Sequence, residues 1–264
     1  ILVFLVIIIL ALNVIFIRGL FITFIILLYL KIVEKKKITL ILNKVSYHKR
    51  GFYEVLVAVC FLSGLMLLPF AEVYTLLMTN PFFVTIFAFL FLKEKVGVRR
   101  WLAIVIGFIG VIIVVNPNKI DFNFFFILPI LAAFFITIRD VTTKNIANDN
   151  NSFEIIFITS LLMTFFSGFG SLFIEFSIEF NALFKITLSS IFLSIAYILS
   201  VLTVFYAPLS LTSSARYSII IFGILFGYLF FGEQPTNNTI IGALIIIISG
   251  LFVIQREKKL GKIK

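Results

Sequence analysis

Continuous apolar runs, most of them about twenty residues long, follow one another along the chain and are separated by short breaks. A helical run of this length matches the thickness of a lipid bilayer, whereas a β-barrel would show shorter alternating segments. Hydrophobic residues make up 62% of the 264 residues, more than a water-soluble domain of this size could bury. The sequence therefore predicts an all-α polytopic membrane protein, with the lipid bilayer as its surroundings.

The breaks divide the chain into about ten expected transmembrane helices, of which the first looks truncated. Residues 1–30 are too long for one comfortable span and too short for two complete ones. We expect a first helix without its N-terminal half, followed by a turn near Leu12–Asn13. The alternative is a single long, tilted helix and a nine-helix protein. The expected helices cover residues 1–12, 14–33, 52–69, 71–92, 98–116, 124–143, 153–174, 186–206, 209–231 and 237–255.

The net charge of +10 is concentrated in the breaks, a pattern that sets membrane topology and does not indicate a nucleic-acid partner. When the Lys35–Lys37 loop is assigned to the cytoplasm, 18 of the 22 lysines and arginines lie inside and two outside. This count treats Arg50 and Arg139 as residues of cytoplasmic breaks. We therefore expect a multi-pass protein of the bacterial cytoplasmic membrane with its C-terminus in the cytoplasm.

Chemically reactive side chains are scarce. The chain has one cysteine, Cys60 in an apolar run, and one histidine, His48 in a basic loop. A nucleophile with its base, a metal cluster or a nucleotide-binding loop is not visible in this pattern. We expect no catalytic residues, no metal and no cofactor. A membrane enzyme or a scaffold remains the alternative from another functional class.

The second half of the sequence repeats the first. The distance from Pro69 to Glu94 equals that from Pro208 to Glu233, and each glutamate precedes a glycine-containing apolar helix. The charge count puts Glu94 inside and Glu233 outside, so the two halves should be inverted repeats of five helices each. We expect the first repeat at residues 1–117 and the second at residues 118–264. Inverted repeats with a midplane site are typical of secondary transporters.

Two stretches carry a resemblance to a known family. AEVYTLLMTNPFFVTIFAFLFLKEKVGVRRWLAIVIGFIGVIIVVNP resembles the fourth and fifth helices of ten-helix drug/metabolite transporters of the EamA type. YAPLSLTSSARYSIIIFGILFGYLFFGEQPTNNTIIGALIIIISG is similar to the matching part of their second repeat, and FIRGLF to part of their second helix. The nearest branch is the group similar to S-adenosylmethionine uptake transporters. The resemblance implies two repeats around a central cavity and transport of a small molecule.

Two arginines lie within apolar runs, where a charge must be paired, hydrated or extended to the membrane surface. Arg216 is a candidate anchor for a substrate carboxylate or phosphate, or it reaches the cytoplasmic surface instead. Arg18 is a second candidate, with an interfacial or structural role as its alternative. Tyr197 and Tyr217 are candidates for hydroxyl or aromatic contacts with a substrate, although ordinary buried tyrosines would look the same.

The expected helix 71–92 carries a polar stripe. Glu72, Thr75 and Thr79 share one face, and Asn80 and Pro81 follow where the proline interrupts backbone hydrogen bonding. Broken helices beside polar side chains bind substrates or ions in carriers. The alternatives are that Glu72 lies in the outer interface and that the threonines bond their own backbone.

Together these features predict a secondary carrier that works by alternating access. Its substrate should be a small metabolite, amino-acid-like or nucleoside-like, and S-adenosylmethionine fits. An exporter of amino acids or drugs is the alternative within the family. The Gly223–Gly227 pair allows close helix contact within one chain or between two, so a homodimer is compatible with the sequence.

Overall fold

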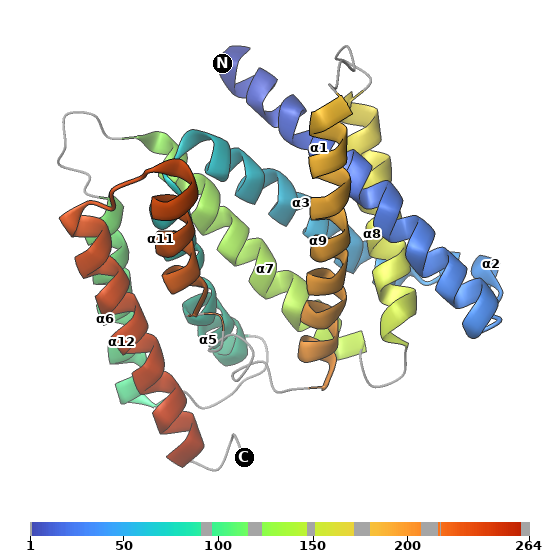
Figure 1. The fold of residues 1–264 in the computed structure, drawn as a ribbon. Helices are drawn as coiled ribbons and strands as arrows, with labels where there is room; N and C mark the ends of the chain where they lie inside the picture. The colour runs from blue at the N-terminus through green and yellow to red at the C-terminus, as the bar shows by residue number, and fades with distance from the viewer. Residues whose placement is uncertain are drawn as a thin grey trace. The chain divides into compact units, whose positions relative to one another are not determined.

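The computed structural model describes the chain as an assembly of helices, and no strand occurs in the described ranges (Figure 1). These ranges are residues 2–90, 97–115, 123–146, 151–171, 180–206, 216 and 218–259. Five helices among them are long and apolar enough to cross a membrane. These five segments are Ile15–Val33, Val45–Leu67, Phe70–Phe87, Phe124–Ile146 and Ser152–Phe169, and shorter apolar helices accompany them. The expected class, an all-α polytopic membrane protein, is confirmed.

The chain forms two compact units, and each unit combines segments from both halves of the sequence. Unit 1 comprises Ile1–Ser63 and Ile138–Tyr206, and unit 2 comprises Gly64–Thr137 and Ala207–Lys264. A compact unit is not a sequence repeat, so the expected repeats at residues 1–117 and 118–264 stay a prediction.

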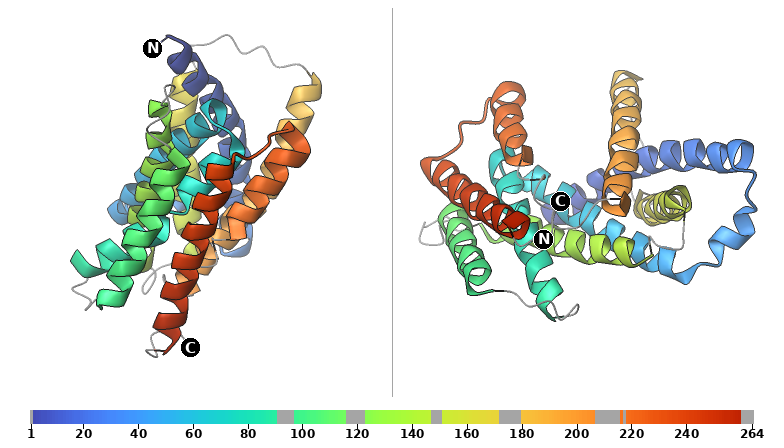
Figure 2. Two further views of the ribbon diagram at one scale, coloured as in Figure 1. Left: turned by 90° about the vertical axis from the view of Figure 1, so that its left-hand side faces the viewer. Right: turned by 90° about the horizontal axis from the view of Figure 1, so that it is seen from below.

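Unit 1 is built around α8, which lies beside α1 (Figures 1 and 2). Asn151 begins α8 because its side-chain oxygen accepts the backbone N–H of Phe153 at 2.8 Å. The elements of this unit are α1 (Leu2–Leu28), the π-helical turn η1 (Tyr29–Val33), α2 (Ile38–Leu42), most of α3 (Val45–Leu67), the end of α7 (Ile127–Ile146), α8 (Ser152–Ser171) and α9 (Phe180–Tyr206).

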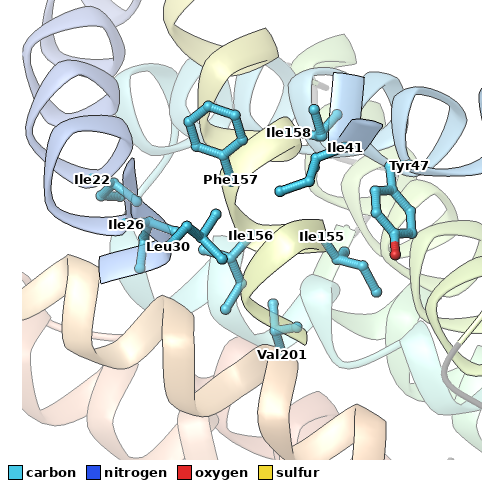
Figure 3. Close-up of a cluster of buried hydrophobic side chains, with 10 residues drawn as sticks. All are labelled: Ile22, Ile26, Leu30, Ile41, Tyr47, Ile155, Ile156, Phe157, Ile158 and Val201. Carbon is cyan, nitrogen blue, oxygen red and sulfur yellow. The ribbon is translucent and has the colours of Figure 1, made fainter. Parts of the chain in front are cut away.

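The core of unit 1 surrounds α8 with apolar side chains from five other elements, α1, η1, α2, α3 and α9 (Figure 3). Ile155 to Ile158 are all buried along one stretch of α8, with Val201 of α9 beside them. The inner side of α2 contributes Ile41, and α3 contributes Tyr47. The short α2 is therefore packed onto the body of the unit.

Unit 2 pairs α6 with α12 and α4 with α11. A Cβ added at Gly110 of α6 would lie 3.0 Å from the Gly242 carbonyl oxygen of α12, so these two backbones nearly touch. The elements are α4 (Phe70–Leu77), α5 (Asn80–Leu90), α6 (Val98–Val115), the 3₁₀ turn η2 (Phe124–Phe126), the start of α7, α11 (Ser218–Phe231) and α12 (Asn237–Lys259).

The expected turn near Leu12–Asn13 is wrong, because α1 runs unbroken from Leu2 to Leu28. The single long helix, our alternative, describes this segment. The physical reason is that Asn13 costs a helix interior only some tenths of a kcal/mol, about 0.5. A turn within an apolar segment would instead expose several backbone groups to lipid, each at a cost of several kcal/mol.

Two arginines that we assigned to cytoplasmic breaks lie inside helices. The helix α3 begins at Val45 rather than residue 52 and therefore includes Arg50, and α7 extends to Ile146 and includes Arg139. Both side chains are buried, Arg50 with an exposed fraction of 2%. Both arginines are therefore paired with groups inside the protein and are not free charges of a loop.

The expected helix 71–92 is interrupted next to Pro81, as its sequence indicated. The first part, α4, ends at Leu77, and α5 begins at Asn80. The residues between them form tighter turns, in which the Met78 and Thr79 N–H groups donate to the Thr75 and Leu76 carbonyls. Proline has no N–H to continue the α-helical pattern, so the interruption falls immediately before it.

Candidate functional site

Arg216 and Asn80, both selected from the sequence, are in direct contact within unit 2. The Arg216 Nη1 donates a hydrogen bond to the Asn80 Oδ1 at 3.1 Å. Arg216 lies just before α11, where its carbonyl accepts the Ile219 N–H, and Asn80 is the first residue of α5. The cation is therefore held at the interruption between α4 and α5.

Asn80 is fixed by further hydrogen bonds to α7. Its Nδ2 donates to the Thr137 Oγ1 at 2.8 Å and to the Ala133 carbonyl at 3.2 Å, and its exposed fraction is 1%. With both ends of the amide engaged, the Oδ1 can face only one way. Asn80 therefore orients Arg216, whose own side chain is only half-buried.

The two threonines of the stripe bond to their own helix. Thr75 donates to the Ala71 carbonyl at 2.6 Å, and Thr79 donates to the Leu76 carbonyl at 2.9 Å. Both are fully buried, which is the arrangement of our alternative interpretation. Glu72 is half-buried in the first turn of α4 and interacts with other groups. Tyr217 lies outside the described residues.

The far end of α4 is also attached to α11, through Glu233. The Glu233 Oε2 accepts the Phe70 N–H at 2.8 Å and thus caps the N-terminus of α4. Gly232 has a φ of +64°, and this left-handed residue ends α11 and turns Glu233 back. Together, Glu233–Phe70 and Arg216–Asn80 hold the α4 segment against α11 at both ends.

Between these two attachments, the glycine pair of α11 packs within the same chain. A Cβ at Gly223 would collide with Tyr74 of α4, and one at Gly227 would crowd Glu233 and Phe70. Phe70 also stacks on Phe231, with ring centroids 4.6 Å apart. The Gly223–Gly227 motif therefore supports contact between α11 and α4, and it needs no second copy of the chain.

A second polar cluster joins four helices in unit 1. Glu54 of α3 accepts from Arg50 at 3.1 Å and from Arg139 of α7 at 3.0 Å. Arg139 also bonds Asp140 at 2.8 Å. Arg50 donates further to Thr143 of α7, Thr159 of α8 and Tyr197 of α9 at 3.1, 2.8 and 2.6 Å. Two cations and two carboxylates thus neutralise each other.

Tyr197 and Arg18, two further predicted residues, belong to this cluster or lie near it. The Tyr197 hydroxyl accepts from Arg50 and donates to the Glu54 Oε2 at 3.3 Å. Arg18 of α1 is half-buried and lies close enough to the Glu54 carboxylate to interact with it electrostatically. The structure thus places Arg18 and Tyr197 in unit 1, and Arg216 and Asn80 in unit 2.

The sequence interpretation missed Arg50, Glu54, Arg139 and Asp140. It assigned both arginines to loops because positive charges usually lie outside the membrane. One available signal was the spacing of Arg50 and Glu54, which are four residues apart and so share a helix face. Such a pair can remain inside a membrane helix when its partners come from neighbouring helices.

A third polar group holds the connection between α1 and α3 to the start of α8. The Glu154 carboxylate binds Lys36 at 2.6 Å, Lys44 at 2.8 Å and the Tyr47 hydroxyl at 3.1 Å. Partial burial alone would lower the pKa of each lysine, but the hydrogen bonds and electrostatic interactions with Glu154, together with those of Glu34 at Lys36 and of Tyr47 at Lys44, outweigh it and raise the pKa. Both ammonium groups therefore stay charged at neutral pH.

Among the residues that the structure describes, no three or more His, Cys, Asp or Glu side chains form a group that could hold a metal ion. Three glutamates are bound to other groups instead: Glu54 to arginines, Glu154 to lysines and Glu233 to a backbone N–H.

The chain is similar to a known protein family and to individual transporters. Residues 2–116 and 123–255 match the EamA-like transporter family. A riboflavin transporter of Vibrio cholerae is 30% identical over 193 residues, covering 72% of this chain and 64% of that protein. An S-adenosylmethionine uptake transporter of Rickettsia conorii is 27% identical, covering 74% and 67% respectively.

Two further similarities have lower sequence identity. A pseudopaline exporter of Pseudomonas aeruginosa is 24% identical, covering 80% of this chain and 74% of that protein. A solved crystal structure with 15% sequence identity matches 96% of this chain and 88% of its own, with a TM-score of 0.66. That last likeness concerns the fold alone.

Proposed function

We propose that this chain, which belongs to the EamA-like transporter family, is a secondary carrier of a small metabolite with a carboxylate or phosphate group. Transport of small metabolites follows from the family and from the relatives named as transporters. The substrate class and the alternating-access mechanism are our proposal.

The Arg216–Asn80 contact is the observation that supports the proposed substrate class. An arginine next to an interrupted membrane helix offers a charged donor where broken helices of carriers bind their substrates. Asn80 is a neutral partner, so this hydrogen bond holds the guanidinium without adding a counter-charge to it. A planar guanidinium can bind a carboxylate through two parallel hydrogen bonds.

S-adenosylmethionine fits this chemistry better than riboflavin does. It carries a carboxylate that Arg216 can bind, whereas riboflavin has no anionic group at neutral pH. The transporters similar to this chain include proteins named for each compound, so both are natural probes. We propose an amino-acid-like or nucleoside-like metabolite, with Glu72, Thr75, Thr79 and Tyr217 of the same unit as further substrate contacts to be tested one by one.

Counterflow in proteoliposomes tests the proposal. Liposomes containing the full chain are preloaded with unlabelled S-adenosylmethionine or riboflavin, and labelled compound is added outside. We expect transient accumulation of labelled S-adenosylmethionine, which Arg216→Gln abolishes and Arg216→Lys partly retains. The exposed Arg99 of α6 gives a matched control, because Arg99→Gln removes the same charge elsewhere.

Two results would contradict the anchor role. One is unchanged accumulation in the Arg216→Gln variant, and the other is counterflow of riboflavin without any of S-adenosylmethionine. Asn80→Asp provides a further check, since a carboxylate at that position would neutralise Arg216. We expect it to weaken substrate binding although it keeps the hydrogen bond.

Export is the second candidate direction, because a relative of this chain is an exporter. Counterflow measures exchange and not direction, so a separate uptake assay in whole cells decides it. We further propose that the chain lies in the bacterial cytoplasmic membrane with its C-terminus inside. Fluorescent-protein and alkaline-phosphatase fusions at Lys264 test this, and an active phosphatase fusion would contradict it.

A further inference from the structure

The connection between α1 and α3 presents two different sides. Its inner side is fixed to the body of unit 1, because Lys36 and Lys44 bind Glu154 and Ile41 is buried in the core. The backbone is fixed as well: Lys35 adopts a φ of +51°, and the Lys36 N–H donates to the Leu30 carbonyl. The outer side is therefore held in a definite arrangement.

The exposed residues of this segment and of the start of α3 combine positive charge with aliphatic side chains. Four lysines are exposed, and the segment holds one acidic residue, Glu34, which is bound to Lys36 and Asn151. Five aliphatic side chains are exposed around them, with Ile32 and Leu40 at 65% and 64%. We call this the α2 surface. It consists of the lysines Lys31, Lys35, Lys37 and Lys49 and the aliphatic residues Ile32, Val33, Leu40, Leu42 and Val45.

The position of the α2 surface in the chain puts it at the edge of the membrane. It comprises the connection between Ile15–Val33 and Val45–Leu67, two segments that are long and apolar enough to span a bilayer, together with the adjoining ends of both segments. A connection of this length must emerge at the surface of the bilayer and stay there. At that depth, aliphatic side chains can enter the acyl region while lysine side chains extend toward the headgroups.

The charge balance distinguishes between kinds of lipid. Glu154 and Glu34 neutralise the inner lysines, and no acidic side chain of the described residues pairs with the outer four. A zwitterionic headgroup offers these lysines no net charge, whereas an anionic one does. A soluble acidic protein could pair with the lysines. It would not contact the neighbouring aliphatic side chains, because they lie at the depth of the bilayer.

We propose that the α2 surface is a binding site for anionic phospholipids, with the four lysines on the headgroup phosphates and Leu40 and its aliphatic neighbours among the acyl chains. The inner ion pairs at Glu154 fix the conformation of the α2 surface for this contact. The site is separate from the Arg216–Asn80 site and does not depend on the transport proposal.

Binding of phosphatidylglycerol and phosphatidylcholine to the purified full chain in neutral detergent tests the charge requirement, with native mass spectrometry as the readout. One variant replaces Lys31, Lys35, Lys37 and Lys49 with glutamine, and a matched variant replaces them with arginine. A lysine near an anionic surface contributes about fivefold in binding. We therefore expect the glutamine variant to lose its preference for phosphatidylglycerol by at least about 25-fold, the combined effect of two such lysines, and the arginine variant to keep it.

The aliphatic part needs a second measurement. In a Cys60→Ser, Leu40→Cys background, a bimane fluorophore at position 40 is exposed to brominated phospholipid or to aqueous iodide. We expect quenching by brominated phosphatidylglycerol and protection from iodide. Equal thermal unfolding of all variants in phosphatidylcholine confirms that they are folded.

The proposal is overturned if the glutamine variant keeps its preference for phosphatidylglycerol, because another surface then selects the lipid. It is also overturned if iodide quenches position 40 and brominated lipid does not, since the α2 surface then faces water or a soluble partner. Loss of preference in the arginine variant as well would show that headgroup charge is not what is recognised.

Discussion

Both units of this protein bring helices close together at glycines, at Gly19 in unit 1 and at Gly242 in unit 2. Unit 1 also joins α3, α7, α8 and α9 through a buried cluster of arginines, carboxylates and hydroxyl groups around Glu54. No ion pair joins the described residues of unit 2, which packs rings such as Phe70 and Phe231 and uses single hydrogen bonds. In lipid, neither mode benefits from excluding water, so polar pairs and close packing are the two remaining ways to bind helices.

We therefore expect different kinds of substitution to destabilise the two units. Loss of one partner in unit 1 leaves an unpaired charge, whereas a larger side chain in unit 2 creates a steric clash. The chain offers a separate probe for each. Cys60, its only cysteine, is half-buried in the part of α3 that belongs to unit 1. Trp101, its only tryptophan, lies in α6 of unit 2 against the ring of Phe89.

The largest effect is expected for Glu54→Gln. It removes the charge that Arg50 and Arg139 share, which should destabilise unit 1 by about 3–5 kcal/mol. A thiol-reactive dye should then label Cys60 at a clearly lower temperature. The control is Glu72→Gln in unit 2, which should shift Cys60 labelling much less, and an equal shift in both variants would contradict the prediction.

Gly242→Ala should have the next largest effect, this time on unit 2. The added Cβ would lie 2.7 Å from the Gly110 carbonyl oxygen, so α6 and α12 must separate, at a cost of about 1–3 kcal/mol. Thermal unfolding followed by Trp101 emission should shift downward. Gly97→Ala is the matched control, because a Cβ there meets nothing within 4 Å. If both variants behave alike, close backbone packing does not hold these helices.

Glu233→Ala should cost about 1 kcal/mol, because it leaves the N-terminus of α4 without its cap. Amide hydrogen exchange at Phe70 should accelerate, while the exchange of α6 amides stays unchanged. Glu233→Gln keeps an acceptor oxygen and should retain most of the protection. Unaltered exchange at Phe70 in the alanine variant would show that the cap is not formed.

The smallest effect concerns the lysines at Glu154 and appears only at alkaline pH. The pKa of Lys44 is raised in the folded protein above 10.5, so its ion pair stabilises the fold below that pH. The stabilisation is lost as the pH rises through the folded-state pKa. Because Lys44 is 40% exposed, Lys44→Gln should change stability by only some tenths of a kcal/mol, about 0.5. Stability of this variant should therefore fall less between neutral pH and pH above 10.5 than in the parent protein.

Much of the fold could be predicted from apolar run lengths, because a bilayer imposes a minimum length on each helix. The start of α6 at Val98 and of α12 at Asn237 agree with the expected ranges. The start of α3 was predicted too late. Hydropathy counts Arg50 as a residue of a polar break, although the Arg50 side chain is neutralised by groups distant in sequence.

For the candidate site, the sequence could identify unusual residues but not their partners. Arg216 and Asn80 stood out separately, one as a charge in an apolar run and the other beside a helix-breaking proline. That Asn80 also bonds Thr137 of α7 depends on tertiary packing, which residue spacing along one helix does not contain. The same holds for Phe70 and Glu233, which are far apart in the chain.

The division of the units across the sequence has a consequence for biosynthesis. Unit 1 needs residues up to Tyr206, and unit 2 needs residues from Gly64 to the end. When the ribosome has made the first half of the chain, neither unit has all its helices, although several spans already lie in the bilayer. The helices that are inserted first therefore lack their packing partners until the later helices have been synthesised and inserted. Translational pauses after the middle of the gene would lengthen the time during which Glu54 lacks Arg139.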